Sequence, residues 1–186
     1  VFFSHSHGDQ THGINDLRIF YLKNGKKIDV YTNSSTKKYL KKSFSYCFFG
    51  KPEYPAILKF KKFKQNISFK DKHEIIKIKS IEVKHGGINC LAFIINNKCA
   101  YASDINKIYK SNLNDFCNLN YFVVDCLRLN PHPSHFNLKE VLNLLDIIKP
   151  KKTILTNLHS DLDYNYLLKI LPRNVKPAHD GLSFNI

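Results

Sequence analysis

Residues 1–10 read VFFSHSHGDQ, and this stretch decides the expected fold. Its apolar beginning is typical of a buried strand, and His5, His7 and Asp9 follow at intervals of two residues. Side chains two apart on a strand share a face, so both imidazoles can point to one spot at the strand end, with Asp9 in the following loop. Imidazole nitrogens and carboxylate oxygens are the ligands of catalytic zinc and similar divalent ions. The stretch therefore predicts a metal site.

The length and composition predict a single domain over residues 1–186. The chain has 186 residues and is 43% hydrophobic, which suffices for a real core. The sequence shows neither a secretory signal nor a run near the ~18 apolar residues of a membrane span. Its five cysteines are odd in number and lack a Cys-x-x-Cys pair, which argues against a disulfide framework and a zinc knuckle. We therefore expect a cytoplasmic, reducing setting.

The formal net charge of +14 raises the question of a nucleic-acid partner. Almost all of the positive charge is lysine, with arginine only at Arg18, Arg128 and Arg173. The densest basic stretches, residues 37–42 and 59–64, fit a solvated face better than a polyanion groove. Nucleic acid is therefore a disfavoured partner.

Hydrophobic periodicity predicts an α/β domain with a β-rich first half and an alternating second half. Helices are expected at 11–22, from Ser34 or Ser35 to 44, at 137–148 and at 163–171. Strands are expected at 28–31, 57–60, 67–69, 75–78, 81–83, 91–95, 98–102, 121–124 and 153–158, with extended chain over 175–186. The Asn96-Asn97 pair predicts a tight hairpin between two of these strands.

Three further polar residues end apolar strands of this pattern: His85, Asp104 and His159. Each has an ordinary explanation, as a turn residue, a helix cap and a loop residue respectively. Strand ends, however, are the edge at which open α/β sheets place their sites. Together with the first motif they form a candidate ligand set. By contrast, His73 and His132 show no partner pattern and are expected at the surface.

The chain resembles the metallo-β-lactamase fold, whose signature His-x-His-x-Asp-His appears here with Gln10 in the last position. The resemblance is closest to the phosphoribosyl cyclic-phosphate phosphodiesterases of phosphonate breakdown. It rests on HGINDLR at 12–18, DCLR at 125–128, PHPSHF at 131–136, LTNLH at 155–159, and DG at 180–181. It implies a four-layer αβ/βα sandwich. Because the chain starts inside an expected strand and lacks methionine, we expect the N-terminal strands to be missing and a strand edge to be exposed.

The resemblance also implies two divalent ions, zinc or manganese, about 3.5–4 Å apart. A hydroxide and Asp104 would bridge them, and the hydroxide would be the nucleophile. The first ion would take His5, His7 and His85, and the second would take Asp9 and His159. Gln10 is a weaker ligand than imidazole, so the second ion would bind loosely, be a harder ion such as manganese, or recruit water instead.

Catalytic roles follow from the same resemblance. Asp9 and His135 would be catalytic, and His135 would protonate the leaving oxygen or stabilise charge on phosphorus. Arg128 is a candidate phosphate contact.

We therefore expect a metal-dependent hydrolase of phosphodiesters, preferring a small cyclic phosphate or nucleotide-like substrate. Three alternatives stay open: a lactonase or thioesterase of the same fold, a nuclease that processes tRNA 3′ ends, and a noncatalytic binding module. The expected partner is a small-molecule phosphodiester, with no membrane association, and a homodimer is compatible with the sequence.

Overall fold

The computed structural model of the protein describes residues 1–71 and 74–186, so that His73 lies outside the described residues. The chain divides into two compact units, residues Val1–Lys64 and Gln65–Ile186. How the two units combine into the single domain expected over residues 1–186 stays a prediction. Among the described residues, no helix has the length and apolar character to cross a membrane.

The first unit combines short helices with a small parallel sheet. Its elements are α1 (Gly8–Thr11), the 3-10 helix η1 (His12–Leu17), α2 (Arg18–Asn24), β1 (Ile28–Val30), α3 (Ser34–Ser43), α4 (Ser45–Phe48) and β2 (Leu58–Phe60). Strands β1 and β2 pair in parallel. Val30, Leu40 and Leu58 are completely buried and form the centre of an apolar cluster in this unit.

Two expectations for the first unit are corrected. The helix expected at 11–22 is three short pieces, and α2 ends at Gly25, whose φ of 63° allows the left-handed cap. Helix α3 is capped by Asn33 rather than by Ser34 or Ser35, because the Asn33 side chain accepts a hydrogen bond from the Thr36 amide at 2.9 Å.

The second unit is a mixed sheet with helices packed against it. Its elements are β3 (Asn66–Asp71), β4 (Glu74–His85), β5 (Ile88–Ile95), β6 (Cys99–Ala102), the 3-10 helix η2 (Lys110–Phe116), β7 (Tyr121–Asp125), α5 (Leu138–Ile148), β8 (Lys152–Thr156), α6 (Tyr164–Ile170) and β9 (Val175–Pro177). The strands lie in sequence order from β3 to β9. Pairs from β3 to β6 are antiparallel, and pairs from β6 to β9 are parallel. These elements confirm the α/β class.

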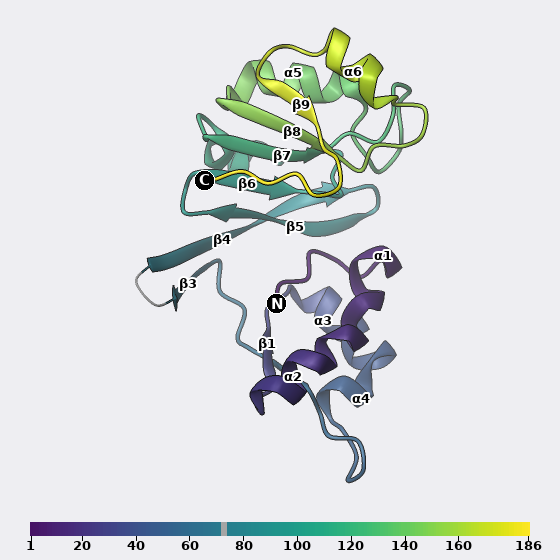
Figure 1. The fold of residues 1–186 in the computed structure, drawn as a ribbon, viewed down its shortest axis with the longest axis vertical. Coiled ribbons are helices and arrows are strands. Elements are labelled where there is room, and N and C mark those ends of the chain that lie inside the picture. The colour runs from purple at the N-terminus through teal and green to yellow at the C-terminus, as the bar shows by residue number, and fades with distance from the viewer. Residues whose placement is uncertain (72–73) are drawn as a thin grey trace. The chain divides into compact units, whose positions relative to one another are not determined.

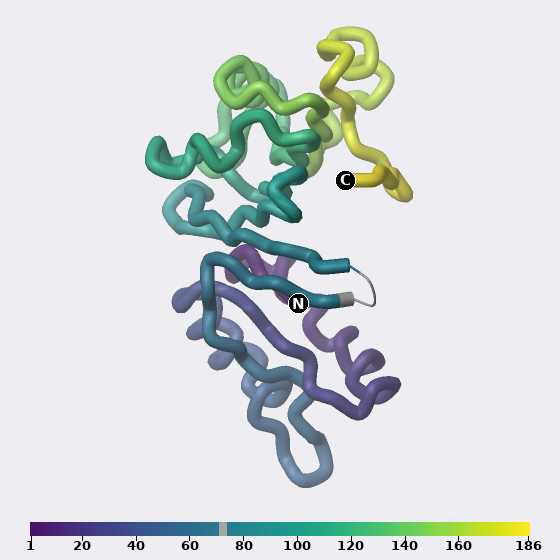
Figure 2. Tube along the Cα trace, turned by 90° about the vertical axis from the view of Figure 1, so that its left-hand side faces the viewer, coloured from purple at the N-terminus to yellow at the C-terminus, as the bar shows by residue number. Residues whose placement is uncertain are grey.

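Figure 1 shows helices α5 and α6 beside β8 and β9, and Figure 2 shows β3 and β4 as adjacent segments of the trace. Helix α5 confirms the helix expected from Asn137: the Asn137 side chain and Glu140 form a capping box. Its apolar face places Val141 and Ile148 in the buried core of this unit. The expected hairpin is confirmed, because Asn96 and Asn97 have φ values of 52° and 53°, as a type I′ turn requires.

Strand direction brings several strand ends to one edge of the sheet. Because β4 and β6 are both antiparallel to β5, and β6, β7 and β8 are mutually parallel, these four strands run the same way. His85 ends β4 and Asp125 ends β7. Strand β8 ends at Thr156, before the expected Leu158, so Asn157 and not His159 directly follows it. Over 175–186, only Val175–Pro177 is strand.

Candidate functional site

In the first unit, the two histidines of the opening motif lie against each other. His5 Nε2 and His7 Nδ1 are 3.1 Å apart, and the rings meet edge to face. His5 is 1% exposed, and its Nδ1 lies 3.0 Å from the Ser4 hydroxyl. The two ring nitrogens therefore meet at one spot, as predicted. The strand expected around them is not formed, because this stretch makes only an isolated bridge from Phe2 to Tyr31.

Asp9 and Gln10 form a pair of their own beside these imidazoles. The Gln10 amide donates from Nε2 to Asp9 Oδ2 at 3.0 Å, and the Ser4 hydroxyl donates to Gln10 Oε1 at 3.4 Å. Partial burial tends to raise the pKa of Asp9, but the Gln10 hydrogen bond and the nearby imidazoles outweigh it, so the pKa lies below its ordinary value. Asp9 is thus an anion at neutral pH.

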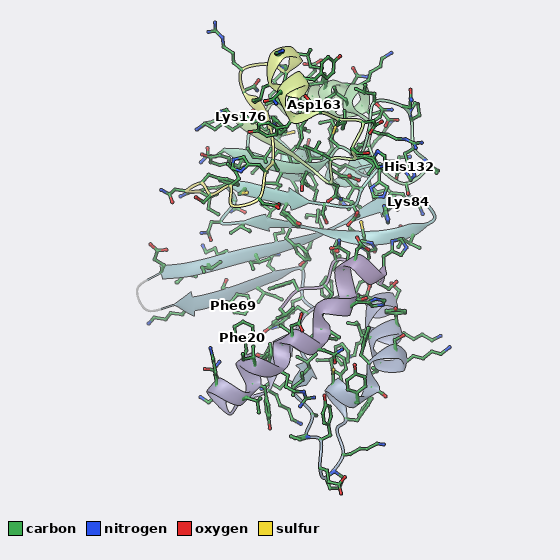
Figure 3. The ribbon with its side chains drawn as sticks, turned by 45° about the vertical axis from the view of Figure 1, so that its right-hand side comes forward. Phe20, Phe69, Lys84, His132, Asp163 and Lys176 are labelled. Atoms are coloured by element: carbon green, nitrogen blue, oxygen red, sulfur yellow. The ribbon has the colours of Figure 1, made fainter. Side chains whose placement is uncertain are left out.

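In the second unit, the edge formed by the strand ends gathers a second cluster. Potential ligand atoms of His85, Asp104 and His135 all lie within 4.8 Å of one another. His85 and Asp104 are buried, and the His135 side chain is 17% exposed. Figure 3 shows the labelled residues Lys84 and His132 at this edge of the sheet.

The chemistry of this cluster fits a divalent metal ion. His85 Nδ1 lies 2.7 Å from the Ser134 carbonyl oxygen, which can only accept, so Nδ1 carries the proton. Its Nε2 therefore keeps the lone pair that a metal ion needs, an arrangement typical of metal-binding histidines. A carboxylate at Asp104 adds the charged oxygen donor that zinc or manganese accepts.

His135 is held by a carboxyl group that the sequence reasoning gave no role. Its Nδ1 lies 2.6 Å from Asp125 Oδ2, and the same oxygen accepts a hydrogen bond from the Ile105 amide at 3.1 Å. Asp125 is completely buried, which raises its pKa to about 9. The Asp125–His135 pair therefore retains a proton across neutral pH. The signal was present in the sequence, because Asp125 ends an apolar strand as Asp104 follows one.

The loop that carries His135 is anchored to the turn after His85. The Asn106 side chain accepts from the Gly86 amide at 3.1 Å and donates to the Pro133 carbonyl at 2.8 Å. Gly86 has φ +54°, and a Cβ there would lie 2.7 Å from Ser134 Cβ. Glycine is therefore required for this close approach. His132, expected at the surface, is half-buried in the same loop, with its ring 5.0 Å from that of His135.

His159 does not join this cluster in the structure. Its side chain is 60% exposed, and its Nδ1 lies 2.9 Å from Asp161 Oδ1. Asn157 stands next to Asp104 instead: its amide Nδ2 donates to Asp104 Oδ1 at 3.0 Å and to the Ser103 carbonyl at 3.3 Å. Sequence reasoning missed Asn157 because an amide is not a typical metal ligand. The metal role of His159 stays a prediction.

Arg128 uses donors of its guanidinium group within its own loop. Its Nε donates to the Asn130 carbonyl at 3.2 Å and its Nη2 to the Pro131 carbonyl at 2.6 Å. These bonds order the stretch that leads to His135. The expected phosphate contact of Arg128 stays a prediction.

Comparison with known proteins identifies the family. The family described as beta-lactamase superfamily domain matches residues 1–157. The crystal structure of a diphosphatase from the PhnP family is similar, with a TM-score of 0.84 and 25% identity, over 97% of this chain and 68% of that chain. No significant match was found among curated proteins.

Two more distant structures share the fold. A metallo-beta-lactamase fold protein from Bacillus subtilis has a TM-score of 0.74 and 17% identity, over 98% of this chain and 75% of that chain. The short form of human tRNase Z has a TM-score of 0.66 and 14% identity, over 100% of this chain and 78% of that chain. The expected metallo-β-lactamase-like αβ/βα fold is therefore confirmed.

Proposed function

The chain belongs to the beta-lactamase superfamily, a family of metal-dependent hydrolases, and on this premise we propose that it hydrolyses phosphodiesters. Its substrate would be a small cyclic phosphate or a nucleotide-like diester. The observation that carries the proposal is the His135–Asp125 pair, in which His135 Nδ1 lies 2.6 Å from Asp125 Oδ2. The same nitrogen lies 3.8 Å from Asp104 Oδ1. A proton donor next to a candidate metal ligand suits the departure of an alkoxide from phosphorus.

His135 is the residue that would move the proton. In this scheme the shared proton lies on His135 Nδ1 and points to Asp125 Oδ2, which also accepts the Ile105 amide hydrogen. Proton transfer to the leaving oxygen then falls to His135 Nε2. Asp125 never contacts the substrate in this scheme; it orients the ring and stabilises the imidazolium form.

His5, His7, Asp9, His85 and Asp104 are the residues that would hold metal ions. Bound divalent ions supply an activated water nucleophile and neutralise charge on the phosphate. The buried His85 ring contributes a fixed direction for its Nε2, because Ser134 holds its other nitrogen. The lowered pKa of Asp9 keeps that side chain anionic and ready to bind a cation.

A diphosphate bond is the second candidate target. The similar crystal structure is that of a diphosphatase, and diphosphate hydrolysis needs the same proton donor and the same metal-binding side chains. A lactone or thioester substrate is less favoured, since the Asp125-supported proton donor has its greatest value for a poor leaving group on phosphorus. The basic charge of +14 on its own would favour RNA, but it comes mostly from lysines that fit a solvated face better than a polyanion groove, so RNA stays a disfavoured substrate class.

Hydrolysis assays on the protein loaded with zinc or manganese test the proposal. We expect turnover of bis-para-nitrophenyl phosphate that is abolished by chelation and by Asp104→Ala. The matched control is Asp146→Ala, because Asp146 is an exposed acidic residue on α5, away from the strand-end edge. Parallel assays use a lactone, a thioester and a nucleoside diphosphate derivative. Turnover of only the lactone or thioester would contradict the phosphodiesterase proposal.

A further inference from the structure

Both carboxylates expected to bind the second metal ion are hydrogen-bonded to side-chain amides. In the first unit, Gln10 Nε2 donates to Asp9 Oδ2 at 3.0 Å. In the second unit, Asn157 Nδ2 donates to Asp104 Oδ1 at 3.0 Å. Each unit thus holds one of these carboxylates against a side-chain amide donor.

The orientation of both amides follows from their other partners. Asn157 faces two acceptors, the Asp104 carboxylate and the Ser103 carbonyl, so its amino group and not its oxygen must point to them. Gln10 faces the Asp9 carboxylate on one side and accepts from the Ser4 hydroxyl on the other. Neither amide therefore offers its oxygen to an ion beside these carboxylates.

The hydrogen bond from Asn157 opposes a bridging role for Asp104. A carboxylate that bridges two ions gives one oxygen to each. Asp104 Oδ1, however, faces the Asn157 amino group, and the His135 ring lies 3.8 Å from the same oxygen. The amide hydrogens are positively polarised and oppose a cation at that oxygen. The Ser103 hydroxyl donates to the other oxygen, Asp104 Oδ2, at 3.3 Å.

Resting on the metal-dependent hydrolysis proposed above, we infer that the protein binds one divalent ion per chain, because Gln10 and Asn157 satisfy the carboxylates that a second ion would need. The ligands expected for the first ion are imidazoles of His5, His7 and His85, and none of these is replaced by an amide. Asn157 suits its position, since its φ of 58° is a left-handed conformation that asparagine adopts readily. In this proposal one ion would supply the activated water and the His135–Asp125 pair would supply the proton.

Metal content tests this inference without relying on activity. The protein is stripped with a chelator, reloaded with excess zinc or manganese, desalted and measured by mass spectrometry of the metal, with calorimetric titration in parallel. We expect one ion per chain in the native protein and two in the Gln10→His/Asn157→His double variant. The isosteric Asn157→Asp variant replaces the amino group with a ligand oxygen and is expected to gain the second ion with little change of shape.

Asn97→His is the matched control, because Asn97 has a similar left-handed φ of 53° but lies in the exposed β5–β6 turn. It should keep one ion. Two ions in the native protein would overturn the inference, and so would one ion in both the double variant and Asn157→Asp. Native protein with two ions that hydrolyses phosphodiesters would leave the proposed function intact. Native protein with no ion and no hydrolysis would overturn both.

Discussion

Asp125→Asn should change the pH dependence of turnover far more than its maximum. In the native protein the buried Asp125 carboxyl, with a pKa of about 9, keeps a proton on its pair with His135. A general acid is active only while protonated, so turnover should fall as the pH rises through about 9. Asparagine cannot ionise and cannot stabilise the imidazolium by charge. His135 should then lose its proton near the ordinary imidazole pKa of about 6.5.

The size of the effect follows from these two values. At pH 8 the Asp125 carboxyl, with a pKa of about 9, is roughly 90% protonated, so the Asp125–His135 pair still holds a proton, whereas an imidazole with the ordinary pKa of about 6.5 is roughly 3% protonated. The expected loss of kcat is therefore about 30-fold at pH 8 and less than about twofold at pH 6. In the variant, the alkaline limb of the pH profile moves to lower pH. The asparagine side chain keeps the shape of the carboxyl group and can still accept the Ile105 amide hydrogen.

The assay is kcat against pH from 5.5 to 9.5 with two phosphodiesters, one with a para-nitrophenolate and one with an alkoxide leaving group. The loss should be larger for the alkoxide, because a poor leaving group depends more on protonation. Asp146→Asn on the exposed face of α5 serves as control and should leave the profile unchanged. An equal loss at pH 6 and pH 8, or equal losses for both leaving groups, would refute the assignment of His135 and Asp125.

Two further predictions concern the surroundings of this pair. Gly86→Ala should lower kcat, whereas Gly87→Ala should not. A Cβ at Gly86 would lie 2.7 Å from Ser134 Cβ in the loop that carries His135, but a Cβ at Gly87 would meet nothing within 4 Å. Equal effects of both variants on kcat would argue against this anchoring role. Iodoacetamide at pH 8 should label Cys117, the half-buried cysteine, before the four buried ones, since burial raises the pKa of both Cys90 and Cys126 to about 12 and keeps these thiols protonated. Peptide mass spectrometry over a time course checks the order, and early labelling of Cys90 would contradict it.

The sequence by itself determined the local elements and the kind of chemistry. Alternation of apolar and polar residues predicted strands at 75–78 and 81–83, which the structure joins in the single strand β4. The strand expected at 121–124 is β7, and the Asn137 cap with its apolar face predicted α5, because these signals act between residues close in the chain. The boundaries were less secure: β8 ends at Thr156, and the helix expected at 11–22 is broken. Residue types also indicated a metal site, and the imidazoles of His5 and His7 do meet, although the strand expected around them is not formed.

Only the tertiary structure decided which polar side chains meet at the edge of the sheet. The parallel pairing of β6, β7 and β8 brings together Asp104, Asp125 and Asn157, which are separated by 21 and 32 positions in the chain. No spacing rule links them, because their neighbourhood depends on strand order and register. For the same reason the sequence favoured His159, a typical metal ligand, whereas the end of β8 places the Asn157 amide against Asp104 and leaves His159 exposed.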